Sequence, residues 1–111
     1  LRDGSVFEYC KLNDMVIQAW SVLQFGYFKG NFFGNEKFQQ LNQVLNRLAL
    51  KYGVSPSAIA IAWVLRYPAK MQAVVGTTNP KHLIEASKAS HVNLTRKEWY
   101  EIYLAAGNDL P

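Results

Sequence analysis

Two short apolar segments, far apart in the chain and separated by helical sequence, constrain the fold most strongly. Residues 15–20 are nearly all apolar, and residues 73–75 are apolar and rich in β-branched side chains. Short runs of this kind are typical of buried strands. Because helices lie between them, the strands are expected to pair in parallel through a right-handed crossover. The sequence therefore predicts an α/β protein with strands buried on both faces.

A polar turn and a helix follow the second apolar segment. Gly76 ends the strand and permits another group to approach the backbone closely. Asn79 is suited to cap a helix and Pro80 to its first position, so residues 81–90 are predicted to be helical. Such a turn presents backbone N–H groups and the positive end of a helix dipole, which favours a phosphate. An ordinary capped turn that binds nothing has the same pattern, and these residues alone favour it.

Two helices are predicted between the apolar segments. Residues 38–49 carry apolar side chains at spacings of three and four, which indicates an amphipathic helix that ends at Gly53. Ser55 and Pro56 are suited to begin the next helix. Residues 58–66 are apolar almost all round, so this second helix is expected to be buried.

The remaining segments complete the predicted order of elements. Residues 1–11 have apolar side chains that fit one face of a helix, and residues 27–35 form a long aromatic loop of the kind that often binds ligands. Thr95 and Glu98 form a capping box at the start of a final helix. The single cysteine, Cys10, is expected to be a buried small hydrophobe, which favours a reducing compartment.

Composition narrows the classes of partner. The net charge is +4, but the twelve lysines and arginines are scattered, and nucleic-acid binding proteins usually carry a basic stripe. No apolar run approaches the roughly 20 residues of a membrane span, and no signal-peptide pattern opens the chain. We therefore expect no nucleic-acid or membrane partner and a cytoplasmic location. The mild positive charge fits either an anionic small ligand or a plain solvated surface.

Two strands do not make a stable parallel sheet, so further strands must come from the same polypeptide or from a second copy. A (β/α)8 barrel uses about 30 residues for each of its units. The 111 residues of this chain could hold the last two units of such a barrel and a closing helix. The first residue is Leu1 rather than methionine, and we expect the chain to be a fragment.

Five motifs, in order and covering nearly the whole chain, closely resemble the C-terminal third of the aldo-keto reductases, and most nearly the bacterial oxidoreductases of that family. They occupy residues 16–23, 48–56, 62–69, 75–80 and 94–99. The resemblance implies the C-terminal part of one incomplete TIM-barrel domain over residues 1–111. It makes residues 16–20 and 72–75 the last two strands of the barrel. It also implies an NADP(H)-dependent oxidoreductase that reduces aldehydes and ketones to alcohols.

The resemblance further implies which residues bind the cofactor. Trp20 matches the aromatic residue that stacks on the nicotinamide, and Ser21 and Leu23 match positions that line the pyrophosphate. Gly76, Thr77 and Thr78 match the loop around the adenosine ribose and its 2′-phosphate.

Two positions depart from the family pattern. His82 stands where many members have an arginine on the adenosine side, and histidine is only conditionally charged. Lys81 beside it is expected to help, while Ala86 stands where some members have an asparagine that contacts adenine. Strong preference for NADP(H) over NAD(H) is therefore in question.

The family's catalytic Asp, Tyr, Lys and His have no counterpart in this sequence. The resemblance thus implies about half of a cofactor site and no proton-transfer residues, and we expect no activity from this chain alone. The alternative is a non-catalytic helical module that self-associates or binds a partner. As a fragment of a barrel, the chain has unpaired strand edges, which predict a homo-oligomer.

Overall fold

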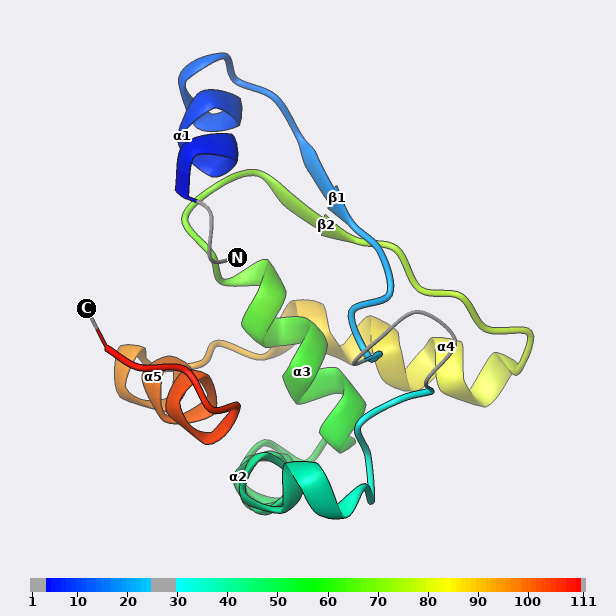
Figure 1. Cartoon of the computed structure of the whole chain (residues 1–111). Coiled ribbons are helices and arrows are strands. Elements are labelled where there is room, and N and C mark those ends of the chain that lie inside the picture. The colour runs from blue at the N-terminus through cyan, green and yellow to red at the C-terminus, as the bar shows by residue number, and fades with distance from the viewer. Residues whose placement is uncertain (1–3, 25–29, 111) are drawn as a thin grey trace.

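The computed structural model describes residues 4–24 and 30–110, and it has the element order that the sequence predicts (Figure 1). One helix precedes the first strand, a helix pair connects the strands, and two helices follow the second strand. The elements are α1 (Gly4–Leu12), β1 (Ile17–Ala19), η1 (Glu36–Phe38), α2 (Gln39–Tyr52), α3 (Pro56–Leu65), β2 (Met71–Ala73), α4 (Pro80–Ser87), η2 (Lys88–His91) and α5 (Arg96–Ala105).

The predicted parallel pairing of the two strands is confirmed, but the second strand lies earlier than expected. β1 pairs with β2 so that Ile17 is opposite Met71 and Ala19 is opposite Ala73. One more hydrogen bond follows, from the Val74 N–H to the Ala19 carbonyl oxygen at 2.8 Å. The chain then turns at Ser21, whose φ is +55°, so residues beyond Val74 have no partner on β1. The strands therefore end at residues 19 and 73.

The prediction that both strands are buried on both faces is wrong for the residues that the structure describes. The central glutamines of the strands, Gln18 and Gln72, are exposed and hydrogen-bond to each other at 3.2 Å. Val16 and Val74 at the strand ends are 52% and 46% exposed. Only the face carrying Ala73 packs against the helical core, so the pair is covered on one side.

The predicted helix boundaries are largely confirmed because their capping groups form. The Gly53 N–H donates to the Ala49 carbonyl oxygen from a left-handed conformation (φ 65°), which ends α2. The Ser55 hydroxyl accepts from the Ala58 N–H at the start of α3. Asn79 caps α4 in the same manner. The helix predicted over residues 81–90 is divided, since α4 ends at Ser87 and continues as the 3-10 turn η2.

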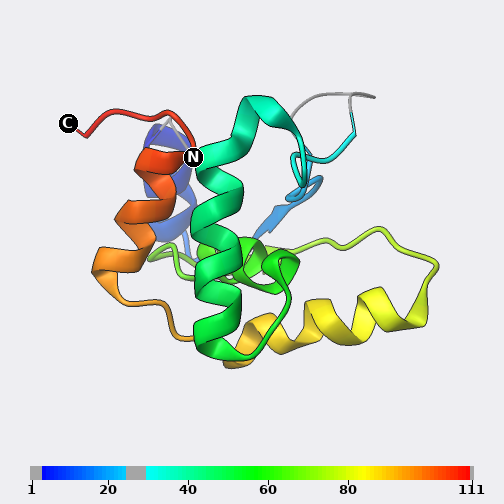
Figure 2. The same ribbon diagram turned by 90° about the horizontal axis from the view of Figure 1, so that it is seen from below.

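Helix α3 lies at the centre of the molecule, and Figure 2 shows α2 between α5 and the α4 segment. The fully buried side chains include Leu45 and Leu48 of α2 and Ile59 of α3. The expected burial of α3 is therefore confirmed.

Within the described residues no single helix is both long and apolar enough to cross a membrane. Only the segments 36–52 and 56–65, bent by 94° to each other, would meet that test together. Cys10 on α1 is only partly buried, whereas the sequence predicted a buried side chain.

A buried carboxylate joins α2 to α5. Glu98 is 5% exposed and accepts hydrogen bonds from the Lys51 ammonium at 2.7 Å, the Tyr52 hydroxyl at 2.5 Å and the Thr95 N–H at 2.8 Å. The last of these bonds belongs to the predicted capping box, which is confirmed. Burial by itself raises the pKa of Glu98, but the three donors together outweigh it and lower that pKa to about 2.

Two tryptophans, Trp63 and Trp99, join α3 to α5 through ring stacking and hydrogen bonds. The rings of Trp63 and Trp99 stack with centroids 4.7 Å apart, and each indole N–H donates to the other residue's carbonyl oxygen at 3.0 Å. This reciprocal pairing satisfies the donors of both partly buried indoles. Trp63 is partly buried and packs against the hydrophobic core.

Candidate functional site

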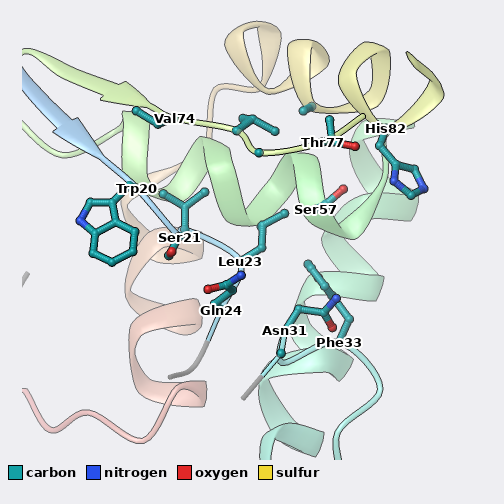
Figure 3. Close-up of a pocket in the computed structure, with 15 residues that line it drawn as sticks. Trp20, Ser21, Leu23, Gln24, Asn31, Phe33, Ser57, Val74, Thr77 and His82 are labelled. Carbon is teal, nitrogen blue, oxygen red and sulfur yellow. The ribbon is translucent and has the colours of Figure 1, made fainter. Parts of the chain in front are cut away.

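A cavity of about 670 Å³ lies at the carboxyl ends of the two parallel strands (Figure 3). One wall follows β1 and includes Trp20, and another follows β2 and includes Val74 and Thr77. The first turn of α3 contributes Ser57, and His82 of α4 lies beyond Thr77. Active sites of parallel α/β proteins occur at this end of the strands, because the connecting loops converge there.

Six of the eight residues predicted to bind a cofactor line this one cavity. They are Trp20, Ser21, Leu23, Gly76, Thr77 and His82. The other two, Thr78 and Lys81, are exposed and lie outside the lining. The structure thus brings together residues from two segments that are distant in the sequence.

The wall after β1 has a strained backbone. Ser21 adopts the left-handed conformation (φ 55°), which costs a residue other than glycine about 1–2 kcal/mol. Its carbonyl oxygen accepts from the Gln24 N–H at 3.0 Å, and Gln24 forms an antiparallel bridge with Asn31. Strain of this kind often persists at functional sites, where the surrounding structure holds it in place. Ser21, Leu23 and Gln24 of this turn all line the cavity.

The wall after β2 ends in a capped turn. The Thr77 hydroxyl accepts from the Asn79 N–H at 3.1 Å, and the Asn79 side chain accepts from the Lys81 N–H at 3.0 Å. The Thr77 hydroxyl therefore keeps its own proton for another acceptor. Gly76 has no positive φ, and a Cβ at this position would meet no atom within 4 Å. The backbone at Gly76 is consequently open on its cavity side, and the described structure itself does not demand a glycine there.

The sequence reasoning missed Ser57 and anticipated only part of the opposite wall. Ser57 lies beside the N-cap of α3, and its hydroxyl oxygen is 2.9 Å from that of Ser55. The sequence already places Ser57 in the first turn of the predicted helix that begins at Pro56, and this position could have indicated a polar group at the end of the sheet. Asn31 and Phe33 belong to the long loop over residues 27–35 that was predicted to contact a ligand, and both line the cavity. Residues 27–29 of that loop lie outside the described residues.

The two ends of the cavity differ in chemistry. Trp20 lies at one end, while Thr77, His82 and Ser57 gather toward the other (Figure 3). Among the described lining residues, His82 is the one titratable side chain. The cavity thus fits an elongated ligand that has a flat ring at one end and a hydrogen-bond acceptor or anion at the other.

In the part of the chain described, no three His, Cys, Asp or Glu side chains are placed to hold a metal ion.

A parallel αβ unit with a cavity at the carboxyl ends of its strands is the arrangement of an α/β-barrel enzyme. The aldo/keto reductase family model matches residues 2–105, and the chain belongs to that family. The predicted α/β class and the predicted family are both confirmed.

Two curated relatives agree with this assignment. The chain is 38% identical over 94 residues to a 6-dehydroglucose reductase of Agrobacterium fabrum, an alignment that covers 83% of this chain and 30% of the relative. It is 32% identical over 113 residues to the oxidoreductase YdhF of Escherichia coli, covering 100% of this chain and 36% of that protein. The chain thus spans about a third of the length of the curated relatives that it matches.

Solved structures of the family have the same fold. The thermostable aldo-keto reductase Tm1743, solved with the inhibitor epalrestat, matches with a TM-score of 0.72 and 26% identity. That match covers 94% of this chain and 34% of the other. An aldose reductase from Giardia lamblia matches with a TM-score of 0.67 at 21% identity, over 90% of this chain and 31% of the other, and supports the fold alone.

Proposed function

We propose that the cavity is part of the NADP(H) site of an aldo-keto reductase that reduces aldehydes and ketones to alcohols. The observation that carries this proposal is the convergence of six predicted cofactor residues on one cavity at the carboxyl ends of β1 and β2. The relatives' names, among them two 6-dehydroglucose reductases, support a carbonyl or sugar-derived substrate for the intact enzyme.

The chemistry of the cavity fits a dinucleotide. Trp20 would offer an aromatic face to the nicotinamide, and Ser21 and Leu23 would line the pyrophosphate. Thr77 retains a hydroxyl donor, and His82 offers an imidazole that can donate to a phosphate oxygen. When bound, the reduced cofactor supplies the hydride that reaches the carbonyl carbon.

The residues of this chain hold and orient the cofactor in this proposal. Gly76 leaves room beside the backbone, and the exposed Thr78 and Lys81, which adjoin the lining residues Thr77 and His82 in the sequence, would contribute a hydroxyl and a positive charge. The proton that completes alcohol formation is supplied by residues without a counterpart in these 111 residues. We therefore assign this chain to cofactor binding and not to proton transfer.

The test is calorimetric titration of NADP⁺ into the chain and into a Trp20→Ala variant. Loss of one aromatic stacking partner typically costs about 1–3 kcal/mol for a base, so Trp20→Ala should weaken binding about tenfold or more. Tyr9→Ala is the matched control, because Tyr9 is 63% exposed against 67% for Trp20 but does not line the cavity. Equal affinities of the two variants would contradict the placement of the nicotinamide, and no binding to the unaltered chain would contradict the proposal as a whole.

A further inference from the structure

Ser57 brings a hydroxyl group into the cavity from a third element, α3, in addition to the two segments that follow the strands. Of the described lining residues, Ser57 is the one that α3 contributes, and its side chain is partly buried. Ligand cavities are mostly apolar and contain a small number of polar groups that fix the orientation of the ligand. The hydroxyl of Ser57 has the position of such a group, although Ser57 is not among the residues that the family resemblance assigns to the cofactor.

Helix α3 does not need the Ser57 hydroxyl for its own cap. Ser55 caps the helix, because its side-chain oxygen accepts from the Ala58 N–H at 3.2 Å. The hydroxyl oxygens of Ser55 and Ser57 are 2.9 Å apart, and either group can donate to the other. A hydroxyl has one proton to donate and two acceptor sites. Ser55 can therefore accept from Ala58 and at the same time donate to Ser57, which leaves the proton of Ser57 for another acceptor.

These hydrogen bonds form a chain that runs from the helix backbone to the cavity. The Ala58 N–H donates to Ser55, the Ser55 hydroxyl donates to Ser57, and the Ser57 hydroxyl is then directed to an acceptor in the cavity. Hydrogen bonds in such a chain polarise one another, so that each bond strengthens the next. The Ser57 hydroxyl is consequently a better donor than the hydroxyl of an isolated serine.

We propose that the Ser57 hydroxyl donates a hydrogen bond to a pyrophosphate oxygen of the bound dinucleotide, and so contributes to the affinity for NAD(H) and NADP(H) alike. This inference rests on the proposed cofactor site. Figure 3 shows Ser57 between Leu23 and His82, whereas Trp20 lies at the far end of the cavity. A dinucleotide whose nicotinamide stacks on Trp20 would thus present its central part to Ser57. The pyrophosphate is that central part, and NAD(H) and NADP(H) share it.

The experiment is calorimetric titration of NAD⁺ and NADP⁺ into the unaltered chain and three variants. Ser57→Ala removes the hydroxyl, and Ser57→Thr keeps it. Ser5→Ala is the matched control, because Ser5 is the second residue of α1, as Ser57 is of α3, and does not line the cavity. Thermal unfolding followed by circular dichroism checks the fold of each variant. Ser57→Ala should unfold at nearly the same temperature as the unaltered chain, because Ser55 supplies the cap of α3.

The expected result is that Ser57→Ala binds both dinucleotides about tenfold more weakly, since a hydrogen bond to a charged group is lost. Ser57→Thr and Ser5→Ala should bind them with nearly unchanged affinity. Equal affinities of Ser57→Ala and the unaltered chain would overturn this inference and leave the cofactor site standing. A loss confined to NADP⁺, or one that Ser57→Thr shares, would do the same. Binding of neither dinucleotide to the unaltered chain would overturn both.

Discussion

The buried carboxylate of Glu98 should make the stability of this chain fall in acid. The pKa of Glu98 is lowered from 4.5 to about 2 in the folded chain. Because the folded pKa lies below the unfolded one, the stabilisation is present above pH 4.5 and is lost as the pH falls from 4.5 toward 2. Protonation would remove the charge that Lys51 and Tyr52 contact while leaving the side chain buried.

The full shift from 4.5 to about 2 corresponds to roughly 3 kcal/mol, at about 1.4 kcal/mol for each pH unit. Lys51 is exposed and therefore partly screened by solvent, which reduces this value. Near pH 3 the full shift would remove about 2 kcal/mol, so with the allowance for screening we expect a decrease of about 1–2 kcal/mol in the free energy of unfolding relative to pH 7. Small domains are stable by about 5–15 kcal/mol in total, so the change is large enough to measure.

The assay is urea unfolding at about pH 7 and pH 3 for the unaltered chain, Glu98→Gln and Glu8→Gln. Glu8 lies on α1 and is exposed, so its variant reports the effect of removing an ordinary carboxylate. Glu98→Gln should be destabilised by about 2–3 kcal/mol at pH 7 and should lose about 1–2 kcal/mol less than the unaltered chain on acidification. The same pH dependence in Glu98→Gln and the unaltered chain would refute the argument that this carboxylate carries the linkage.

Two further predictions concern activity and assembly. A polypeptide of these 111 residues should oxidise NADPH no faster than a buffer blank across a panel of aldehydes, because we expect the family's proton-transfer residues to have no counterpart in it; steady turnover by the purified chain would contradict this. The same polypeptide should form dimers or larger oligomers at micromolar concentration, because Met15, Val16 and Val74 are about half exposed beside strands that pair only with each other in the described structure. Light scattering that gives the mass of a monomer would count against the second prediction.

The sequence predicted the helices well because their boundaries depend on local groups. Ser55 and Thr95 cap their helices by bonds to residues three positions along, and Gly53 ends α2 through its own backbone conformation. Such interactions are complete within one turn of chain, so they can be inferred without knowledge of the fold.

The strands were predicted less accurately because their limits depend on a partner. Residues 73–75 have the composition of a strand, but pairing ends at Ala73, since the chain after β1 turns away at Ser21. Burial was overestimated for the same reason. An apolar run indicates which residues favour a covered surface, whereas neighbouring elements decide which of them are covered.

The family, the order of the elements and most of the residues proposed to bind a cofactor could be predicted from the amino-acid sequence alone, because each rests on a local motif. The tertiary structure decided that Trp20 and Ser21, which follow β1, share a cavity with Thr77 and His82, which follow β2. It also added Ser57 from the first turn of α3 and placed Thr78 and Lys81 outside the lining. Parallel pairing is the physical reason, because it brings the carboxyl ends of two strands to the same edge, and a linear motif does not contain that proximity.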